Sequence, residues 1–146
     1  MSKAPRISLS DAFSKVSFLD GRTPEHSLSG DGQDCFGTLS DYRDGGIFIA
    51  HYSGSSEWER HPGDELVQVI EGETTIYLLI DGEEKPVSLL AGELVVVPQG
   101  IWHRFSTPVG VKVMTVTPQP TEHSIAFPRC MDSLPTGGYG LNPTKD

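Results

Sequence analysis

Short runs of β-branched, aromatic and aliphatic residues recur through the middle of the chain, and turn residues separate them. The runs that we expect to form strands are residues 47–52, 74–80, 85–90, 94–97 and 111–117. The pair Asp81-Gly82 between two of these runs is typical of a tight β-hairpin. Because many short strands alternate with turns and almost no helical periodicity is present, the sequence predicts an all-β sandwich or barrel.

The two ends of the chain differ in composition from the middle. Residues 10–16 predict a short helix that is capped by Ser10. Residues 20–34 are rich in Gly, Ser and Asp and are expected to form a loop, and the tail is rich in Pro, Gly and Thr without an apolar period. The predicted units are an N-terminal arm and loop (1–35), a β-barrel (36–118) and an irregular C-terminal tail that packs on the barrel or on a partner (119–146).

The charge of the chain excludes several classes of partner. The 146 residues carry a formal net charge of −9, with 11 Lys and Arg in all. Such a chain lacks the basic surface that nucleic acid binding needs, and an anionic membrane surface would repel it. No apolar run has membrane-spanning length and the N-terminus lacks the core of a signal peptide, so a cytoplasmic location is expected. Cys35 and Cys130 are expected to be reduced thiols.

The stretch WERHPGDELVQVIEG, residues 58–72, brings metal-binding residue types together. Side chains alternate across a strand, so Glu59 and His61 share one face. The turn residues that follow allow Glu65, at the start of the next strand, to fold back beside them. Two carboxylates and an imidazole suit a divalent metal ion. The alternative is an ion pair between His61 and Glu65 at a surface turn.

A second stretch, residues 92–103, supplies a fourth donor. The β-branched run that ends at Val97 is followed by a corner at Pro98 and Gly100, and His103 comes where the next strand begins. The predicted metal ligands are therefore Glu59, His61, Glu65 and His103. Such a set leaves coordination positions free, as catalytic metal sites do.

The two stretches resemble the paired motifs of the cupin superfamily, G-x5-H-x-H-x3-E-x6-G and G-x5-P-x-G-x2-H-x3-N. The residues that match these motifs are His61, Glu65, Gly72, Gly92, Pro98, Gly100 and His103. The chain departs from the motifs at three positions. Glu59 stands where the first motif has its leading histidine, Gly54 lies one place past the expected glycine, and Thr107 replaces the final asparagine.

The resemblance implies a double-stranded β-helix, or jelly-roll barrel, with a bound divalent metal. It also implies a homodimer, because small cupins often exchange terminal strands. Since Glu59 replaces a neutral imidazole, the site is harder and favours Fe, Mn or Zn over Cu(I). The other positions expected on the inner faces are apolar, which predicts a hydrophobic or aromatic small molecule that chelates the metal through oxygen atoms.

Three functions remain open from the sequence. The first is a metal-dependent, dioxygenase-like enzyme acting on an oxygen-chelating organic molecule. The second is a non-catalytic small-molecule-binding or sensor protein, which the departures at Glu59 and Gly54 keep open. The third is an isomerase or lyase that uses the metal as a Lewis acid. Metal-free sugar epimerases of related fold rank last, because this chain retains the motif ligands.

Several other residues have alternative interpretations. Tyr77 is a weak candidate for a catalytic acid or base, and a core aromatic is the alternative. Glu59 could be solvated, which would leave three ligands, and His51 is a possible replacement. Residues expected to lie in exposed loops are His26 and His123. Residues expected to face away from the metal are Trp58 and Trp102.

Overall fold

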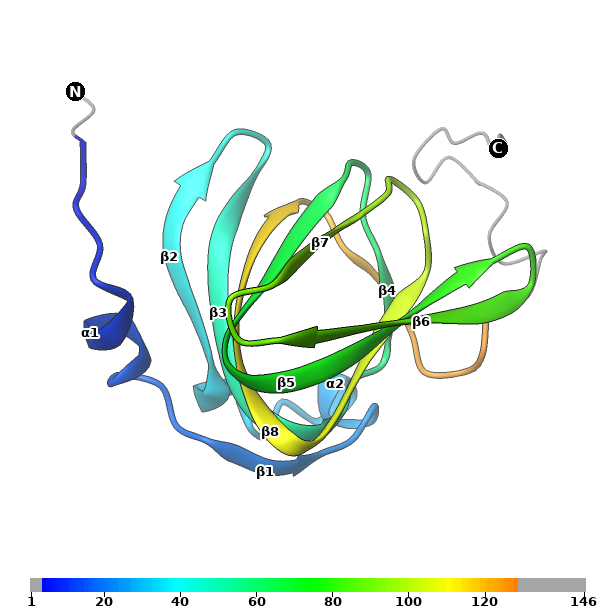
Figure 1. Ribbon diagram of the computed structural model, residues 1–146, viewed down its shortest axis with the longest axis horizontal. Coiled ribbons are helices and arrows are strands. Elements are labelled where there is room, and N and C mark those ends of the chain that lie inside the picture. Colours follow the sequence, from blue (N-terminus) through cyan, green and yellow to red (C-terminus); the bar gives the residue numbers. More distant parts are fainter. Residues whose placement is uncertain (1–3, 129–146) are drawn as a thin grey trace.

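The computed structural model describes residues 4–128, and it shows strands that curl around a common interior (Figure 1). The helices are α1 (Leu9–Phe13), α2 (His26–Ser29) and the 3₁₀ turn η1 (Gln33–Cys35). The strands are β1 (Leu19–Arg22), β2 (Phe36–Tyr42), β3 (Gly45–Ser55), β4 (Trp58–Arg60), β5 (Glu65–Ile80), β6 (Glu83–Leu90), β7 (Leu94–Val97), β8 (His103–Pro118) and β9 (Glu122–Ser124). In the described part of the chain, no helix has the length and apolar character needed to cross a membrane.

Three long strands form the body of the barrel. β8 pairs with β3 along one edge and with β5 along the other, both antiparallel, and β5 also pairs with β6 and β7. β5 and β8 each run for 16 residues because they bend without ending. At the bend, a Cβ on Gly72 would lie 2.2 Å from the carbonyl oxygen of Gly110. The two strands can approach this closely because glycine has no Cβ. Gly72 therefore lies within one continuous, bent strand.

The alternating pattern of β5 buries one face of the strand in the barrel. Val67, Val69 and Ile76 have no exposed surface, while the residues between them are partly exposed. Full burial of a side chain of this size contributes about 1.5–3 kcal/mol. These residues join a larger core of Tyr52, Leu78, Phe105, Val111 and Val113. Phe105 of this core packs against His103, one of the polar side chains described below, with ring centroids 6.2 Å apart.

The Asp81-Gly82 hairpin is confirmed. Both residues have positive φ, +54° and +77°, as a type I′ turn requires, and Ile80 pairs directly with Glu83 across it. The five predicted runs all lie within strands, although most of the strands are longer. Sequence periodicity therefore located these five strands.

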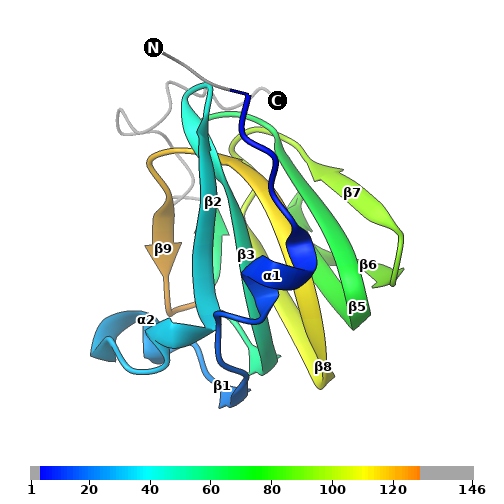
Figure 2. The same cartoon turned by 90° about the vertical axis from the view of Figure 1, so that its left-hand side faces the viewer.

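The N-terminal arm is more ordered than its composition predicts. α1 is capped by Ser8, whose Oγ accepts a hydrogen bond from Asp11 N at 3.1 Å, and not by Ser10. α1 lies against β2 and β3 (Figure 2). The loop expected over 20–34 contains the end of β1, all of α2 and most of η1, so that prediction is wrong for these elements. Cys35, which ends η1, is a buried free thiol, whereas Cys130 lies outside the described residues.

Two strands come from beyond the predicted barrel limits of 36 and 118. β1 pairs in parallel with β3, and β9 pairs with β4. The β1 contact depends on Gly54, which has φ +108° and on which a Cβ would lie 2.3 Å from Arg22 O. Ser53 reinforces the contact, because its Oγ accepts from Gly21 N at 2.9 Å and donates to Asp20 Oδ1 at 3.0 Å.

Gly54→Ala is expected to destabilise the protein more than the matched change Gly110→Ala. Both glycines have φ +108°, but the nearest atom to a Cβ on Gly110 is 3.6 Å away, an ordinary contact. Gly110→Ala should cost the backbone strain alone, about 1–3 kcal/mol. Gly54→Ala adds a clash with the β1 backbone, so its loss of unfolding free energy should exceed about 4 kcal/mol. Urea denaturation measures both, and equal losses would show that β1 is not held against Gly54.

Candidate metal centre

Three buried polar side chains meet inside the barrel. His61 directly follows β4, while Glu65 and His103 are the first residues of β5 and β8. Glu65 Oε1 lies 3.2 Å from His61 Nε2 and 3.0 Å from His103 Nε2. All three side chains are at most 4% exposed, so the alternative of a surface ion pair between His61 and Glu65 is wrong.

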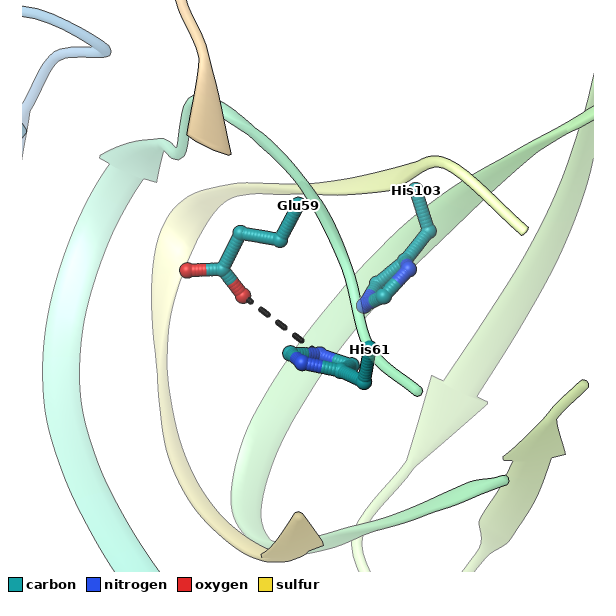
Figure 3. A group of neighbouring side chains, drawn as sticks. All are labelled: Glu59, His61 and His103. Atoms are coloured by element: carbon teal, nitrogen blue, oxygen red, sulfur yellow. Dashed lines mark ion pairs between the residues drawn. The ribbon is translucent and has the colours of Figure 1, made fainter. Parts of the chain in front are cut away.

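Glu59 completes the predicted set. Its backbone pairs with His103 across β4 and β8, and Figure 3 shows one of its carboxylate oxygens directed at the His61 imidazole. Glu59 Oε1 lies 4.0 Å from His61 Nε2, and its side chain is 21% exposed. Donor atoms of Glu59, His61 and His103 all lie within 4.8 Å of one another. The structure thus brings together all four residues that the sequence singled out.

The turn of the second motif, residues 98–100, is hydrogen-bonded to the loop that carries His61. Gly100 N donates to His61 O at 3.0 Å, and Gln99 N donates to Asp64 Oδ1 at 2.8 Å. Pro98 and Gly100 therefore hold the loop that carries His61 against the strand entrance that carries His103. Thr107, in place of the motif asparagine, has a structural role: its Oγ1 donates to Glu73 O at 2.7 Å and accepts from Gly110 N at 3.1 Å.

Outer hydrogen bonds orient the donor atoms. His103 Nδ1 donates to the carbonyl of Ile101 at 2.9 Å, which directs Nε2 into the site. His61 Nδ1 is hydrogen-bonded to Thr121 Oγ1 at 2.9 Å, and Thr117 Oγ1 donates to Glu65 Oε2 at 2.6 Å. Partners of this kind fix the ring orientation and tautomer of histidine ligands in metal sites.

Charges within the site depend strongly on one another. Burial opposes ionisation of Glu65, but the hydrogen bond from His103 and the neighbouring His61 imidazole hold its pKa well below the usual range. Burial also opposes a charge on His103, yet Glu65 outweighs it and raises the His103 pKa. Burial and the carboxylates of Glu57 and Glu65 raise the pKa of Glu59 to about 8. Without metal, the site therefore holds an ionised Glu65 that favours the protonated form of His103, and at neutral pH Glu59 is largely neutral.

The donor atoms fit a metal ion. His61 Nε2 is buried and has no hydrogen-bond partner among the described residues, although Glu65 Oε1 is nearby. An unsatisfied buried polar atom is costly, and a metal ion between the two imidazoles would satisfy it. Two ligands that each lie about 2.1 Å from one ion are at most about 4.2 Å apart. The separations of 3.0, 3.2 and 4.0 Å all fall within this limit.

A cavity of about 520 Å³ opens onto these side chains. Its wall includes Glu59, His61 and Glu65, the apolar side chains of Tyr52 and Phe105, and residues 19–38 of the N-terminal region in part. A small organic molecule could therefore reach the donor atoms while its apolar part contacts the aromatic wall.

A second charged group lies beside Glu59, and the sequence interpretation missed it. His123 Nδ1 lies 2.8 Å from Glu57 Oε2 and 3.7 Å from Glu59 Oε2. Glu57 Oε1 accepts from Arg22 Nη2 at 3.0 Å. Burial opposes ionisation of Glu57, but His123 and Arg22 lower its pKa to about 2. The period of two residues through Glu57, Glu59 and His61 was the signal that could have placed Glu57 in this group.

The remaining histidines are placed as follows. His123 is half exposed, but it lies on β9 and not in a loop. His26 lies on α2 and is only partly exposed, so the expectation of an exposed loop is wrong for it. Both line the cavity. His51 packs against Phe18, with ring centroids 4.8 Å apart, and pairs with Lys112, so it does not replace a ligand.

The aromatic residues near the ligands face outward. The Arg60 guanidinium lies 4.7 Å from the Trp102 ring centre, and Trp58 packs edge-on against Phe127. Both tryptophans face away from the donor atoms, as expected. Tyr77 is also on the outer side, where the Arg104 guanidinium lies 4.2 Å from its ring centre. Tyr77 is not among the residues that line the cavity, so its catalytic role stays a prediction.

Comparison with known proteins agrees with this geometry. Residues 46–117 match the family model of the cupin domain. Residues 46–117 are a cupin domain. A solved cupin 2 conserved barrel domain protein from Leptotrichia buccalis aligns with a TM-score of 0.50 and 26% identity, over 57% of this chain and 40% of that one. A conserved protein of unknown function from Streptococcus pyogenes aligns with a TM-score of 0.54 over 82% of this chain and 91% of that one, but its identity of 18% shows the fold alone.

Among curated proteins, the cupin chain is similar to the acireductone dioxygenase of Rhodopseudomonas palustris. The two are 29% identical over 59 residues, which are 40% of this chain and 36% of that enzyme. The chain thus matches about a third of the length of its curated relatives.

Proposed function

We propose that the protein is a metal-dependent, dioxygenase-like enzyme that acts on a small organic molecule chelating through oxygen atoms. His61, Glu65 and His103 would bind the metal, with Glu59 as the fourth ligand, and Fe, Mn or Zn suits this donor set. The observation that carries the proposal is the buried, unsatisfied His61 Nε2 at the end of an open cavity. The similarity to a dioxygenase over 59 residues supports the same reaction class.

The protein would contribute position and environment. A divalent metal with open positions supplies Lewis acidity and, where it is iron, redox chemistry toward O₂. Ile101, Thr121 and Thr117 hold the three inner ligands in orientation through their hydrogen bonds. Tyr52 and Phe105 give the cavity an apolar wall, which excludes water from the donor atoms when a substrate fills it.

His61→Ala should remove the metal, and His51→Ala is its matched control. His61 is buried among the donor atoms, whereas His51 lies on the outer face of β3. We expect one tightly bound ion per chain in the wild type and in His51→Ala, and none in His61→Ala, by elemental analysis of the purified proteins. The wild type loaded with Fe(II) should consume O₂ with a member of a set of chelating diketones and phenols. A wild type without metal, or a loaded protein inert across that set, would refute the proposal.

A further inference from the structure

The cavity wall contains a buried cation that lies outside the cupin domain. Arg22 ends β1, is 8% exposed and lines the cavity. The approach of β1 to Gly54 and the hydrogen bonds of Ser53 fix its backbone. The match to the family model begins at residue 46, so Arg22 lies in a part of the chain that this match does not include.

Aromatic rings and one carboxylate hold the guanidinium of Arg22 in place. It lies 4.6 Å from the ring centre of Tyr52 and 5.0 Å from that of Phe36. Within the described residues, the Arg22 side chain makes one hydrogen bond, from Nη2 to Glu57 Oε1 at 3.0 Å. A guanidinium has five N–H donors, so a ligand in the cavity can take the others. A planar cation stacked on aromatic rings is already oriented before any ligand binds.

The carboxylate of Glu57 is shared between Arg22 and a second residue. Its two oxygens are divided, with Oε1 on Arg22 and Oε2 on His123. His123 in turn lies 3.7 Å from Glu59, which lies 4.0 Å from His61 Nε2. Arg22 is thus joined to the metal donors Glu59 and His61 by a series of contacts, and all of these residues line the same cavity.

We propose that Arg22 binds the carboxylate of a small organic anion whose chelating oxygens lie at the metal donors. The metal end of this proposal rests on the proposed function. The planar fork of a guanidinium matches a carboxylate in two parallel hydrogen bonds. A phosphate dianion fits less well, because Glu57 and Glu59 lie beside the same space. The substrate class is therefore an aromatic or apolar monocarboxylate that carries a pair of chelating oxygens.

The test compares two probes that differ only in the carboxylate, 3,4-dihydroxybenzoate and catechol. The protein is loaded with Zn(II), so that binding is measured without turnover, by isothermal titration calorimetry. A charge-assisted bond of this kind should make the wild type bind 3,4-dihydroxybenzoate about 10- to 100-fold more tightly than catechol. Arg22→Lys keeps the charge but loses the fork, so its preference should be smaller.

Removing Arg22 alone would leave Glu57 short of a partner, so the deciding variant is Arg22→Gln/Glu57→Gln. It should fold, bind zinc and have equal affinity for both probes. Glu57→Gln alone keeps Arg22 and should keep the preference. Equal affinities in the wild type, or a preference that survives in the double variant, would overturn the proposal.

A metal-free comparison separates this inference from the proposed function. Benzoate and benzyl alcohol have no chelating pair, so the difference in their binding between the metal-free wild type and the double variant reports on the Arg22–Glu57 pair. A preference for benzoate that disappears in the double variant supports the role of Arg22 even if zinc does not bind. No preference for benzoate refutes that role, even if zinc binds tightly.

Discussion

Glu65→Gln is expected to abolish metal binding while the barrel stays folded. Glutamine has the shape of glutamate, and its amide can accept from Thr117 and donate to the Nε2 atoms of His61 and His103, which Glu65 contacts at 3.2 and 3.0 Å. The variant loses the negative charge and reverses the hydrogen bond to His103, whose Nε2 then accepts as neutral imidazole, so its unfolding free energy should stay within about 1–2 kcal/mol of the wild type. Zinc affinity should fall by more than the roughly 10- to 100-fold that loss of an outer partner costs.

Thr117→Val provides the graded control for Glu65. It removes the hydrogen bond to Glu65 Oε2 but leaves every predicted ligand in place. Its zinc affinity should therefore fall by about 10- to 100-fold, between the wild type and Glu65→Gln. Competition with a chelator measures the affinities, and urea denaturation measures the stabilities. If Glu65→Gln bound zinc as tightly as Thr117→Val, Glu65 would not be a ligand.

The four predicted donors could be found from the sequence because each has a local signal. The period of two residues puts Glu59 and His61 on one face, and the turn residues after His61 return the chain to Glu65. His103 required a second stretch, and the order and spacing of the two motifs linked it to the first. Local patterns predict which face of a strand a side chain occupies. The spacing of the two family motifs predicts which strands bring those faces together.

Arg22 and His123 could not be found in this way. Both come from short strands, β1 and β9, whose partners are more than 25 residues away in the sequence. The composition around Arg22 is that of a loop, and nothing local indicates that Gly54 leaves room for β1. Tyr77 lies on a strand that was predicted, but only the pairing of β5 with β8 shows that its neighbour is Arg104.

The affinity for metal is expected to fall steeply as the pH is lowered below about 8. In the metal-free protein, burial and the nearby carboxylates of Glu57 and Glu65 raise the Glu59 pKa to about 8. Below that pH the ion must displace a proton from Glu59, which costs about tenfold in affinity per pH unit. His103, whose pKa is raised, releases a second proton from Nε2. Competition by the Glu59 proton alone should lower zinc affinity about 50-fold from pH 8 to pH 6, and the His103 proton adds to this fall.

Glu59→Gln separates the two protons. The variant cannot release the Glu59 proton, so its slope of log affinity against pH should be smaller by about one between pH 6 and 8. The slope that remains belongs to His103, which still contacts Glu65. Chelator competition at each pH, corrected for the protonation of the chelator, gives both slopes. A variant with the same slope as the wild type would mean that Glu59 keeps its proton when the metal binds, and so lies outside the ligand set.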